Sequence, residues 1–414
     1  MGTVDGDSEN YSIGLNNGAR RRVVLTGVGA VSPAGPESKA HLSGLLAGRS
    51  AARELTEDWF APFAKSIGAP VDSVTPAAGL PRHVAYADLA ITEALAEAGL
   101  DAEELAGTHL VTSTAIGASV ELETAFRDAS VIPPGWFGFD LVTERAREQH
   151  KVGRHGWSMT LSTGCTAGLD ALGTGYDAVA AGRARRVLVV SAEATMCPIV
   201  LAAFQKIGAL SNRDVEAERA SAPFSRQRDG FVLGEGAAAV LLEDAELATA
   251  RGAQPLLEVL GWASVSSAYH MTRIRRSGED IAASIRQALD DAGLPPDAVE
   301  SIDAHGTSTP LNDASETAAY HDVFGARANR LPVVAQKGVT GHALGASNLL
   351  EIAGLARYLP GGALPPTANT TAETLDADLD VVLDEPRLAE PEIVVKTSSG
   401  FSGIHSAAVL RRIS

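Results

Sequence analysis

An internal duplication constrains the fold of this 414-residue chain more than any other sequence feature. Three stretches recur in the same order in both halves: Val23–Ser32, Ala90–Leu100 and Leu110–Thr114 in the first, and Leu257–Ser266, Ser284–Leu294 and Ser301–Ala304 in the second. A repeat period of roughly 200 residues is typical of a duplicated domain, because solenoid repeats span only roughly 20 to 50 residues. We therefore divide the chain into an N-terminal half, residues 21–255, and a C-terminal half, residues 256–414.

Strands and helices are expected to alternate throughout both halves. Apolar periodicity indicates helices at 39–47, 85–98, 120–128 and 139–150, and Gly99 provides a stop signal for the second of these. The segment Val187–Ala194 opens with apolar β-forming residues, as expected of a central strand covered on both faces. This alternation predicts an α/β architecture with mainly parallel sheets.

The first expected strand ends in a glycine-rich turn, and its Gly27-x-Gly29 spacing is shared with dinucleotide-binding loops. The third glycine of that fingerprint is missing, because Ser32 stands in its place. No acidic residue follows at a strand end about 20 residues further on. The sequence therefore argues against a nucleotide site here.

The stretch Ser162–Gly168 reads Ser-Thr-Gly-Cys-Thr-Ala-Gly, between an apolar lead-in and a helix-like pattern. A strand, a tight turn and a helix in succession place the turn at a helix N-terminus, where unpaired N–H groups and the dipole favour a thiolate. Cys165 is thus a candidate acyl-accepting nucleophile. The other interpretation is a small buried core cysteine, which the local stretch alone favours.

Three glycine-framed turns of the C-terminal half carry unusual chemistry. His305 follows a short strand, Lys337 and His342 share a second turn, and Ser398–Gly403 follows the strand at 393–397. A lone histidine is usually structural, but two histidines that a duplication can bring opposite a cysteine favour catalysis. A thiolate captures an acyl group as a thioester. Two imidazoles that donate from Nε2 hold the oxygen of a second thioester while it becomes an enolate.

The composition excludes several other classes of function. A net charge of −17 argues against a general nucleic-acid binder and against an anionic membrane surface. With only Cys165 and Cys197, neither a disulfide framework nor a zinc site is expected, and a reducing cytoplasm fits. Neither a signal peptide nor a membrane-spanning run is expected. Residues 1–20 are polar and rich in Gly and Asn, so we expect a disordered tail there.

Several motifs together resemble the beta-ketoacyl-acyl carrier protein synthases of the elongating type, which are condensing enzymes of the thiolase fold. The resemblance covers about residues 21–412 and rests on five motifs: Gly164–Asp170, Asp229–Ala237, His305–Thr309, Leu311–Asp313 and Gly341–His342. Particular similarity to the ketosynthase alpha subunits of bacterial type II polyketide synthases lies in Gly164–Thr166, Ala268–Thr272 and Ser399–Phe401. The resemblance implies an α/β, thiolase-like duplicated fold with five layers, α-β-α-β-α, and neither a metal nor a bound cofactor.

The resemblance also implies catalytic roles. Cys165 would carry the growing acyl chain, while His305 and His342 would bind the malonyl thioester carbonyl and assist decarboxylation. Lys337, held by Glu316, would fix the polar network behind them. None of these roles follows from residue spacing alone.

Substrate contacts are implied in the same way. The backbone N–H groups of Cys165 and Phe401 would form the oxyanion hole, and Phe401 would act as a gate between the acyl and malonyl steps. Thr307 and Thr309 would contact the phosphopantetheine arm of an acyl carrier protein, which carries the substrates, and Phe231 would also bind substrate. The basic residues that could meet this acidic carrier or its phosphate are Arg273, Arg275 and Arg276, with a solvated charge run as the alternative.

Three parts of the sequence depart from the family pattern: two single residues and one four-residue segment. Ser402 stands where a glycine is usual in the Gly-Phe-Gly-Gly turn, which is costly if that residue needs a positive φ. Gly338 follows Lys337 where a serine is usual, and Arg273–Arg276 replaces a turn that contains Pro or Gly. We therefore expect an altered gate loop.

The leading hypothesis is decarboxylative Claisen condensation of malonyl-acyl carrier protein with an acyl chain on Cys165, in cytoplasmic type II polyketide biosynthesis. Two alternatives stay open: a fatty-acid elongation ketosynthase, and a non-elongating chain-length-factor-like subunit, although the latter class lacks the cysteine. A thiolase would be expected to need a second catalytic cysteine in the C-terminal half, and this sequence has no cysteine beyond Cys197. A ketosynthase III or chalcone-synthase type would be expected to have Asn at the position that His342 occupies. The expected partners are an acyl carrier protein and a second copy or a chain-length-factor-like homologue, with no nucleic acid and no membrane.

Overall fold

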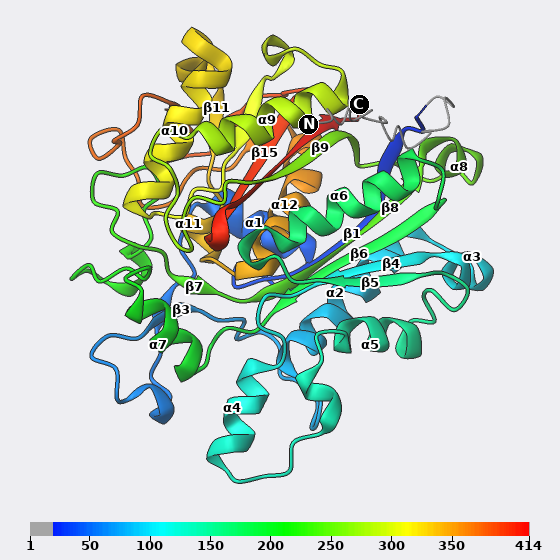
Figure 1. The fold of residues 1–414 in the computed structure, drawn as a ribbon, viewed down its shortest axis with the longest axis horizontal. Helices are drawn as coiled ribbons and strands as arrows, with labels where there is room; N and C mark the ends of the chain where they lie inside the picture. Colours follow the sequence, from blue (N-terminus) through cyan, green and yellow to red (C-terminus); the bar gives the residue numbers. More distant parts are fainter. Residues whose placement is uncertain (1–19, 414) are drawn as a thin grey trace, which may run out of the picture.

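The computed structural model describes residues 20–413 (Figure 1). Its main element is one sheet of eleven strands in the order β13-β11-β10-β15-β16-β9-β1-β8-β6-β4-β5. These strands are β1 (Val23–Val31), β4 (His109–Ser113), β5 (Ser158–Leu161), β6 (Arg186–Glu193), β8 (Gly236–Asp244), β9 (Leu257–Ser266), β10 (Ser301–Asp303), β11 (Pro332–Val334), β13 (Asp380–Val381), β15 (Ile393–Gly400) and β16 (Ile404–Arg412). The tail expected at 1–20 lies outside the described residues, except for Arg20.

The strand order shows the duplication directly. The block β5-β4-β6-β8-β1 of the first half corresponds to β11-β10-β15-β16-β9 of the second, and the two blocks meet where β1 pairs with β9. The recurring sequence stretches occupy equivalent places, as β1 and β9, β4 and β10, and the helices α2 (Arg82–Ala98) and α9 (Glu279–Ala292). Both helices end at a left-handed glycine, Gly99 and Gly293, which confirms the stop signal expected at Gly99.

Helices and strands form five layers, α-β-α-β-α, as the resemblance implies (Figure 1). Helices α6 (Ala167–Ala180) and α12 (Ser347–Gly361) form the middle layer between the two blocks of strands. The outer face of the first block is covered by α2 and α5 (Leu141–Gln149), and that of the second by α9 and α10 (Pro310–Phe324). The active-site loops described below lie where the middle helices begin.

Three hydrophobic cores fill the spaces between these layers. Along β6, Val187 and Val189 belong to the core of the middle layer, whereas Leu188 and Val190 belong to the core beneath α2. All four side chains are fully buried. This confirms the prediction of a central strand that is covered on both faces.

The glycines of β1 serve helix packing. Gly27 and Gly29 lie inside the strand, and a Cβ added at Gly29 would lie only 2.0 Å from the Ala90 carbonyl oxygen of α2. In β9, a Cβ at Gly261 would lie 2.7 Å from the Ala288 carbonyl oxygen of α9. Glycine thus allows the same close helix approach in both halves, which accounts for the Gly-x-Gly spacing without a nucleotide loop.

The sheet is mixed, so the expectation of mainly parallel sheets is wrong. The strands β4, β5 and β6 are parallel, as are β10, β11 and β15, but β1, β8, β9 and β16 run antiparallel to their neighbours. The connection between β15 and β16 is the three-residue turn η8 (Phe401–Gly403). A connection this short allows only an antiparallel return.

Shorter elements connect the layers. They are the helices α1 (Ser38–Ala47), α3 (Ala102–Gly107), α4 (Ser119–Arg127), α7 (Pro198–Lys206), α8 (Ala245–Ala250) and α11 (Lys337–Thr340), and the strands β2 (Arg53–Glu54), β3 (Ile67–Ala69), β7 (Leu233–Gly234), β12 (Ala363–Leu364) and β14 (Arg387–Leu388). The helices expected at 39–47, 85–98, 120–128 and 139–150 are confirmed as α1, α2, α4 and α5.

Candidate active site

Cys165 lies between the end of a strand and the start of a helix, as the sequence predicts. Strand β5 ends at Leu161, the 3-10 turn η3 (Gly164–Thr166) follows, and α6 begins at Ala167. Gly164 takes a left-handed φ of 68°, which glycine adopts without steric cost. The Cys165 side chain is half-buried at this helix start.

Both halves of the chain hold this loop in place. Thr163 and Thr166 donate hydroxyl hydrogen bonds to one oxygen of Asp170, at 2.5 Å and 2.8 Å. From α12, the side-chain amide of Asn348 donates to the Cys165 carbonyl oxygen at 2.5 Å. The C-terminal half therefore braces the loop of the N-terminal half, a contact that no local pattern around Cys165 indicates.

The pKa of the Cys165 thiol corrects the expectation drawn from the helix N-terminus. Burial raises the pKa of Cys165 to about 11, although the Lys337 charge and the backbone N–H of Phe401 both lower it. Desolvation disfavours the thiolate more strongly than these neighbours favour it. At neutral pH the thiol form of Cys165 is therefore favoured over the thiolate.

His305 and His342 line the same cavity as Cys165. Seven residues predicted for the site line this cavity: Cys165, Phe231, His305, Thr307, Thr309, His342 and Phe401. The other residues of the lining are Ile274, Asn312, Ser399 and Gly400. The two imidazole rings are nearly perpendicular, with an interplanar angle of 87° and 5.4 Å between their centroids. His305 follows β10 and His342 follows α11, so both come from the C-terminal half.

Each histidine has its Nδ1 atom engaged. Lys337 Nζ lies 3.2 Å from His305 Nδ1 and donates to the His305 carbonyl oxygen at 2.8 Å, while Ser347 Oγ lies 2.9 Å from His342 Nδ1. An ammonium group can only donate, so His305 Nδ1 accepts and Nε2 carries the proton. Burial, helped by the Lys337 charge, lowers the pKa of both histidines well below the usual value, so both are neutral.

Glu316 does not hold Lys337, and that part of the prediction is wrong. The Glu316 carboxylate accepts hydrogen bonds from the backbone N–H groups of His305 and Gly306, both at 2.8 Å. It also accepts from three side chains, those of Asn312 (2.9 Å), Tyr320 (2.7 Å) and Thr397 (2.8 Å). Glu316 therefore fixes the His305 loop, while Lys337 pairs with Glu351 at 2.6 Å.

The polar network expected behind the histidines is a buried charge cluster, and the sequence analysis missed three of its members, Asp303, Glu351 and Lys396. Lys337 and Lys396 each contact Glu351 at 2.6 Å, and Lys396 also pairs with Asp303 at 2.8 Å. All four side chains are at most 3% exposed. A signal exists in the sequence, because a lysine that ends an apolar run and an aspartate just before His305 both need buried partners.

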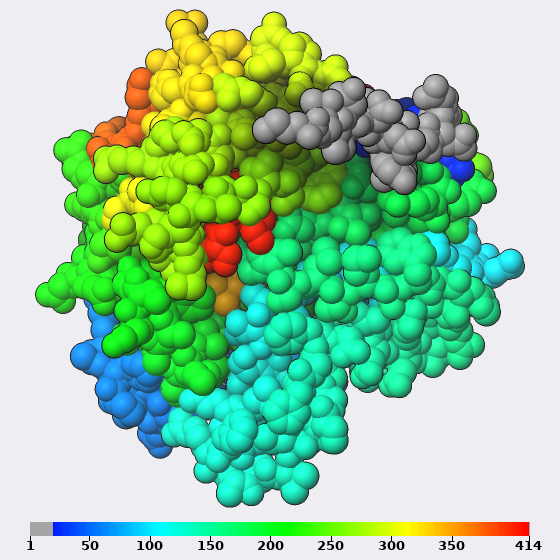
Figure 2. All heavy atoms as spheres, viewed as in Figure 1, coloured from blue at the N-terminus to red at the C-terminus, as the bar shows by residue number. Residues whose placement is uncertain are grey.

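The turn Phe401–Gly403, which connects β15 to β16, contributes Phe401 to the lining of the site. Ser402 adopts a φ of 73° and a ψ of 3°, so the serine that departs from the family pattern does occupy a left-handed conformation. Its N–H donates to the Met271 carbonyl oxygen at 2.6 Å, which fixes the turn. Figure 2 shows red atoms of the C-terminal segment in a groove between the yellow-green and the cyan-green parts of the surface.

A second cavity, of about 320 Å³, also contains Cys165 and Phe401. Its lining is Ala115, Ile116, Ser162, Thr163, Gly164, Cys165, Phe204, Leu344, Phe401, Ser402 and Ile404. The Phe401 ring stacks on Phe204 with 6.3 Å between centroids. Phe401 thus borders both cavities that meet at the thiol, which is the position a gate requires.

The basic segment predicted to meet a carrier borders the first cavity through Ile274. Arg273 and Arg276 are exposed. The Arg275 guanidinium pairs at 2.9 Å with each of two carboxylates, those of Glu279 and Asp280. Its charge is therefore used within the chain, which leaves Arg273 and Arg276 as the better candidates for a carrier contact.

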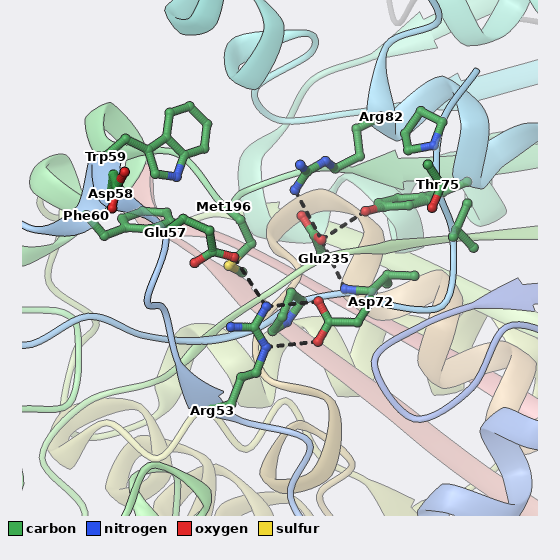
Figure 3. Close-up of a pocket in the computed structure, with 15 residues that line it drawn as sticks. Arg53, Glu57, Asp58, Trp59, Phe60, Asp72, Thr75, Arg82, Met196 and Glu235 are labelled. Carbon is green, nitrogen blue, oxygen red and sulfur yellow. Dashed lines mark hydrogen bonds and ion pairs between the residues drawn. The ribbon is translucent and has the colours of Figure 1, made fainter. Parts of the chain in front are cut away.

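A charged cavity of about 460 Å³ lies elsewhere in the N-terminal half (Figure 3). Arg53 pairs with Asp72 at 2.8 Å, and the buried Glu235 accepts from Tyr86 at 2.9 Å and lies 3.7 Å from Arg82. These contacts link the charged side chains of the cavity to one another, but Oε2 of Glu235 has no hydrogen-bond partner among residues 20–413. None of the residues predicted for the site lines this cavity, so we assign the chemistry to the cavities at Cys165.

The described residues offer neither a metal site nor a membrane-spanning helix. Among residues 20–413, no group of three or more His, Cys, Asp and Glu side chains is arranged to hold a metal ion. Within the same residues, no helix combines the length and the apolar character needed to cross a bilayer.

Two family models match the chain. The N-terminal domain of beta-ketoacyl synthases matches residues 20–248, and the C-terminal domain matches residues 256–371. The tetracenomycin polyketide synthase ketoacyl synthase alpha subunit of Streptomyces glaucescens is 37% identical over 95% of this chain and 98% of its own length. The 3-oxoacyl-acyl-carrier-protein synthase 2 of Coxiella burnetii is 33% identical over 95% of this chain and 99% of its own.

Solved structures agree with these matches. A ketosynthase described as bound to the hexaketide, in complex with its type II PKS acyl-carrier protein, superposes with a TM-score of 0.88 at 33% identity, covering 95% of this chain and 100% of its own. The ishigamide ketosynthase/chain length factor superposes with a TM-score of 0.86 at 33% identity, covering 96% and 100%. The chain therefore belongs to the beta-ketoacyl synthase family of acyltransferase-type condensing enzymes.

Proposed function

We propose that this chain is a type II polyketide ketosynthase that condenses malonyl-acyl carrier protein, with decarboxylation, onto an acyl chain held on Cys165. The observation that carries the proposal is the cavity that joins the Cys165 thiol to His305 and His342. Identity of 37% to the tetracenomycin relative, against 33% to the Coxiella synthase, supports the polyketide pathway over fatty-acid elongation. The presence of Cys165 argues against a non-elongating chain-length-factor-like subunit.

The first half-reaction loads the acyl chain. Cys165 Sγ loses its proton and attacks the carbonyl carbon of an acyl thioester, and the carbonyl oxygen becomes an oxyanion. The phosphopantetheine sulfur then leaves and takes up the proton. We assign the oxyanion to the backbone N–H groups of Cys165 and Phe401, because both already act on the thiol and lower its pKa.

The second half-reaction forms the new carbon–carbon bond. His305 and His342 donate from Nε2 to the malonyl thioester oxygen, the bond to the carboxylate breaks, and the departing CO2 leaves its electron pair as an enolate. The enolate carbon attacks the acyl-Cys165 carbonyl, and the sulfur leaves as a thiolate that is reprotonated. Neutral imidazoles suit this role, because each keeps one proton to donate.

The other predicted residues support Cys165, His305 and His342 or contact the substrate. Lys337 sets the tautomer of His305, and Glu316 fixes the backbone of the same loop. Phe401 gates the passage between the two cavities. The side chains that contact the phosphopantetheine arm or the malonyl group are Thr307, Thr309 and Phe231.

The substrates arrive on the phosphopantetheine of an acyl carrier protein, and no bound cofactor is required, because decarboxylation itself supplies the carbanion. Arg273 and Arg276 are the exposed cations that we assign to the acidic carrier. A second subunit, either another copy or a chain-length-factor-like homologue, completes the enzyme, which works in the cytoplasm. Two similar structures, one described as a complex with an acyl-carrier protein and one as a ketosynthase/chain length factor, support these partners.

Elongation assays with defined acyl- and malonyl-carrier proteins test the proposal. We expect Cys165→Ala to abolish condensation while carrier binding persists, because only the nucleophile is lost. We expect His305→Ala to slow malonyl decarboxylation, measured as CO2 release, by ~100-fold or more. Full elongation by Cys165→Ala would contradict the mechanism, and unchanged CO2 release by His305→Ala would remove that residue from the site.

A further inference from the structure

Lys396 is a fully buried lysine surrounded by oxygen atoms. Its side chain is 0% exposed, and Nζ pairs with Asp303 Oδ1 at 2.8 Å and with Glu351 Oε2 at 2.6 Å. Nζ also donates to the Ala304 carbonyl oxygen at 3.2 Å. Asp303 and Lys396 are register partners on the adjacent parallel strands β10 and β15. Three oxygens, from β10, from the residue that follows β10 and from α12, thus form a cage around one ammonium group of β15.

One carboxylate connects this cage to His305. Glu351 has one oxygen on Lys396 and the other on Lys337, and Lys337 contacts both Nδ1 and the carbonyl oxygen of His305. A carboxylate held at both oxygens keeps one orientation, whereas a carboxylate held at one oxygen can rotate. The far end of the cage is anchored too, since Asp303 Oδ2 accepts hydrogen bonds from Gln336 (2.7 Å) and Tyr358 (2.9 Å).

Stability alone does not account for the Asp303–Lys396 pair. Replacing a buried ion pair by neutral residues of similar volume is often neutral or stabilising, whereas removing one partner is costly. The Lys396 charge also contributes to the lowered pKa of both His305 and His342, so its field reaches the cavity. The Asp303–Lys396 pair is therefore close enough to influence the electrostatics of both histidines.

We propose that Lys396 is a positioning residue for the condensation. Its ammonium is a fixed internal counter-ion that holds Glu351 in the orientation in which Lys337 sets the tautomer of His305. Lys396 itself touches no substrate cavity. The inference rests on the proposed function, and its tests are chosen to separate the two.

Two variants separate positioning from stability. Lys396→Met leaves two buried carboxylates facing a neutral side chain, so its unfolding midpoint is expected to fall, and Asp303→Asn/Lys396→Met removes one charge of each sign and is expected to restore it. In both variants we expect kcat for CO2 release from malonyl-carrier protein to fall about tenfold or more, with KM changed less than about twofold. Recovery of kcat together with stability in the double variant, or a double variant that does not fold, would overturn the proposal.

Chemical rescue provides a second readout. Lys396→Ala opens space in the cage, whereas the methionine side chain of Lys396→Met fills it. Methylammonium chloride is expected to raise kcat of Lys396→Ala about tenfold and to leave Lys396→Met unchanged. Tetramethylammonium chloride at equal concentration, too large for the cage, controls for ionic strength. Equal responses of the two variants would overturn the proposal, while a wild-type enzyme without decarboxylation activity would instead refute the proposed function.

Discussion

Replacing Glu316 by glutamine tests whether this carboxylate positions the His305 loop. The change keeps the side-chain shape, removes the charge and puts an NH2 group in place of one acceptor oxygen. In the wild type, Oε1 and Oε2 together accept from five donors, namely His305 N, Tyr320 OH and Thr397 Oγ1 on the first, and Gly306 N and Asn312 Nδ2 on the second. The glutamine oxygen can serve only one of these two groups.

The glutamine side chain has two possible orientations. The loss of stability is smaller when the NH2 group faces the two donors Gly306 and Asn312 than when it faces the other three donors. Asn312 can turn its amide and accept from the new NH2, because its Oδ1 has no partner within residues 20–413, but the turn breaks the 3.1 Å hydrogen bond from Nδ2 to Asp313 Oδ1. The Gly306 N–H is part of the backbone and stays unsatisfied. A buried donor without a partner costs ~1–3 kcal/mol, so the free energy of unfolding of Glu316→Gln should fall by at least that amount.

Urea unfolding and CO2 release from malonyl-carrier protein measure the two consequences. Displacement of the His305 loop by ~1 Å can cost ~100-fold in rate, so we expect a loss of kcat well beyond the loss of stability. Glu373→Gln is the matched control, because Glu373 is exposed. Wild-type stability and rate in Glu316→Gln would refute the reasoning, as would an equal loss in the control.

Two further predictions concern the thiol and the turn beside it. Because the pKa of Cys165 is raised to about 11 and the thiolate is the reactive form, alkylation of Cys165 by iodoacetamide should accelerate about tenfold per pH unit between about pH 7 and 10. The fully buried Cys197 should stay unmodified, and a rate that levels off below about pH 9 would contradict the raised pKa. For the turn, a left-handed serine costs roughly 1–2 kcal/mol, so Ser402→Gly should stabilise the protein by ~0.5 kcal/mol or more after the entropy cost of glycine. Ser402→Val should destabilise it, and urea unfolding midpoints in the opposite order would contradict this.

The framework of the fold was accessible from the sequence because the duplication leaves local signals in both halves. The strands β1 and β9 and the helices α2 and α9 each carry their own apolar pattern, and both helices end at a glycine. The direction of β16 was not accessible in this way. It depends on the turn Phe401–Gly403, and its left-handed Ser402 gives none of the Asn-Gly or Asp-Gly signals of a tight hairpin.

In the site, too, local patterns indicated some residues, whereas the contacts between layers could not be predicted. The glycine-framed turns indicated Cys165, His305 and His342, but the partner of Lys337 depends on which layer a glutamate occupies. Glu316 lies on the outer helix α10, whereas Glu351 lies on the middle helix α12. Sequence spacing does not distinguish these layers. For the same reason the helix N-terminus at Cys165 was predictable, while the desolvation that raises its pKa depends on packing between both halves.

Mass spectrometry shows directly whether Cys165 carries the acyl chain. The protein is mixed with an acyl-carrier protein, digested, and its peptides are analysed before and after malonyl-carrier protein is added. We predict one acyl adduct, on the peptide that contains Cys165, and its disappearance as the β-ketoacyl product forms on the carrier. An adduct on another residue, or none on an enzyme that still forms product, would contradict the account.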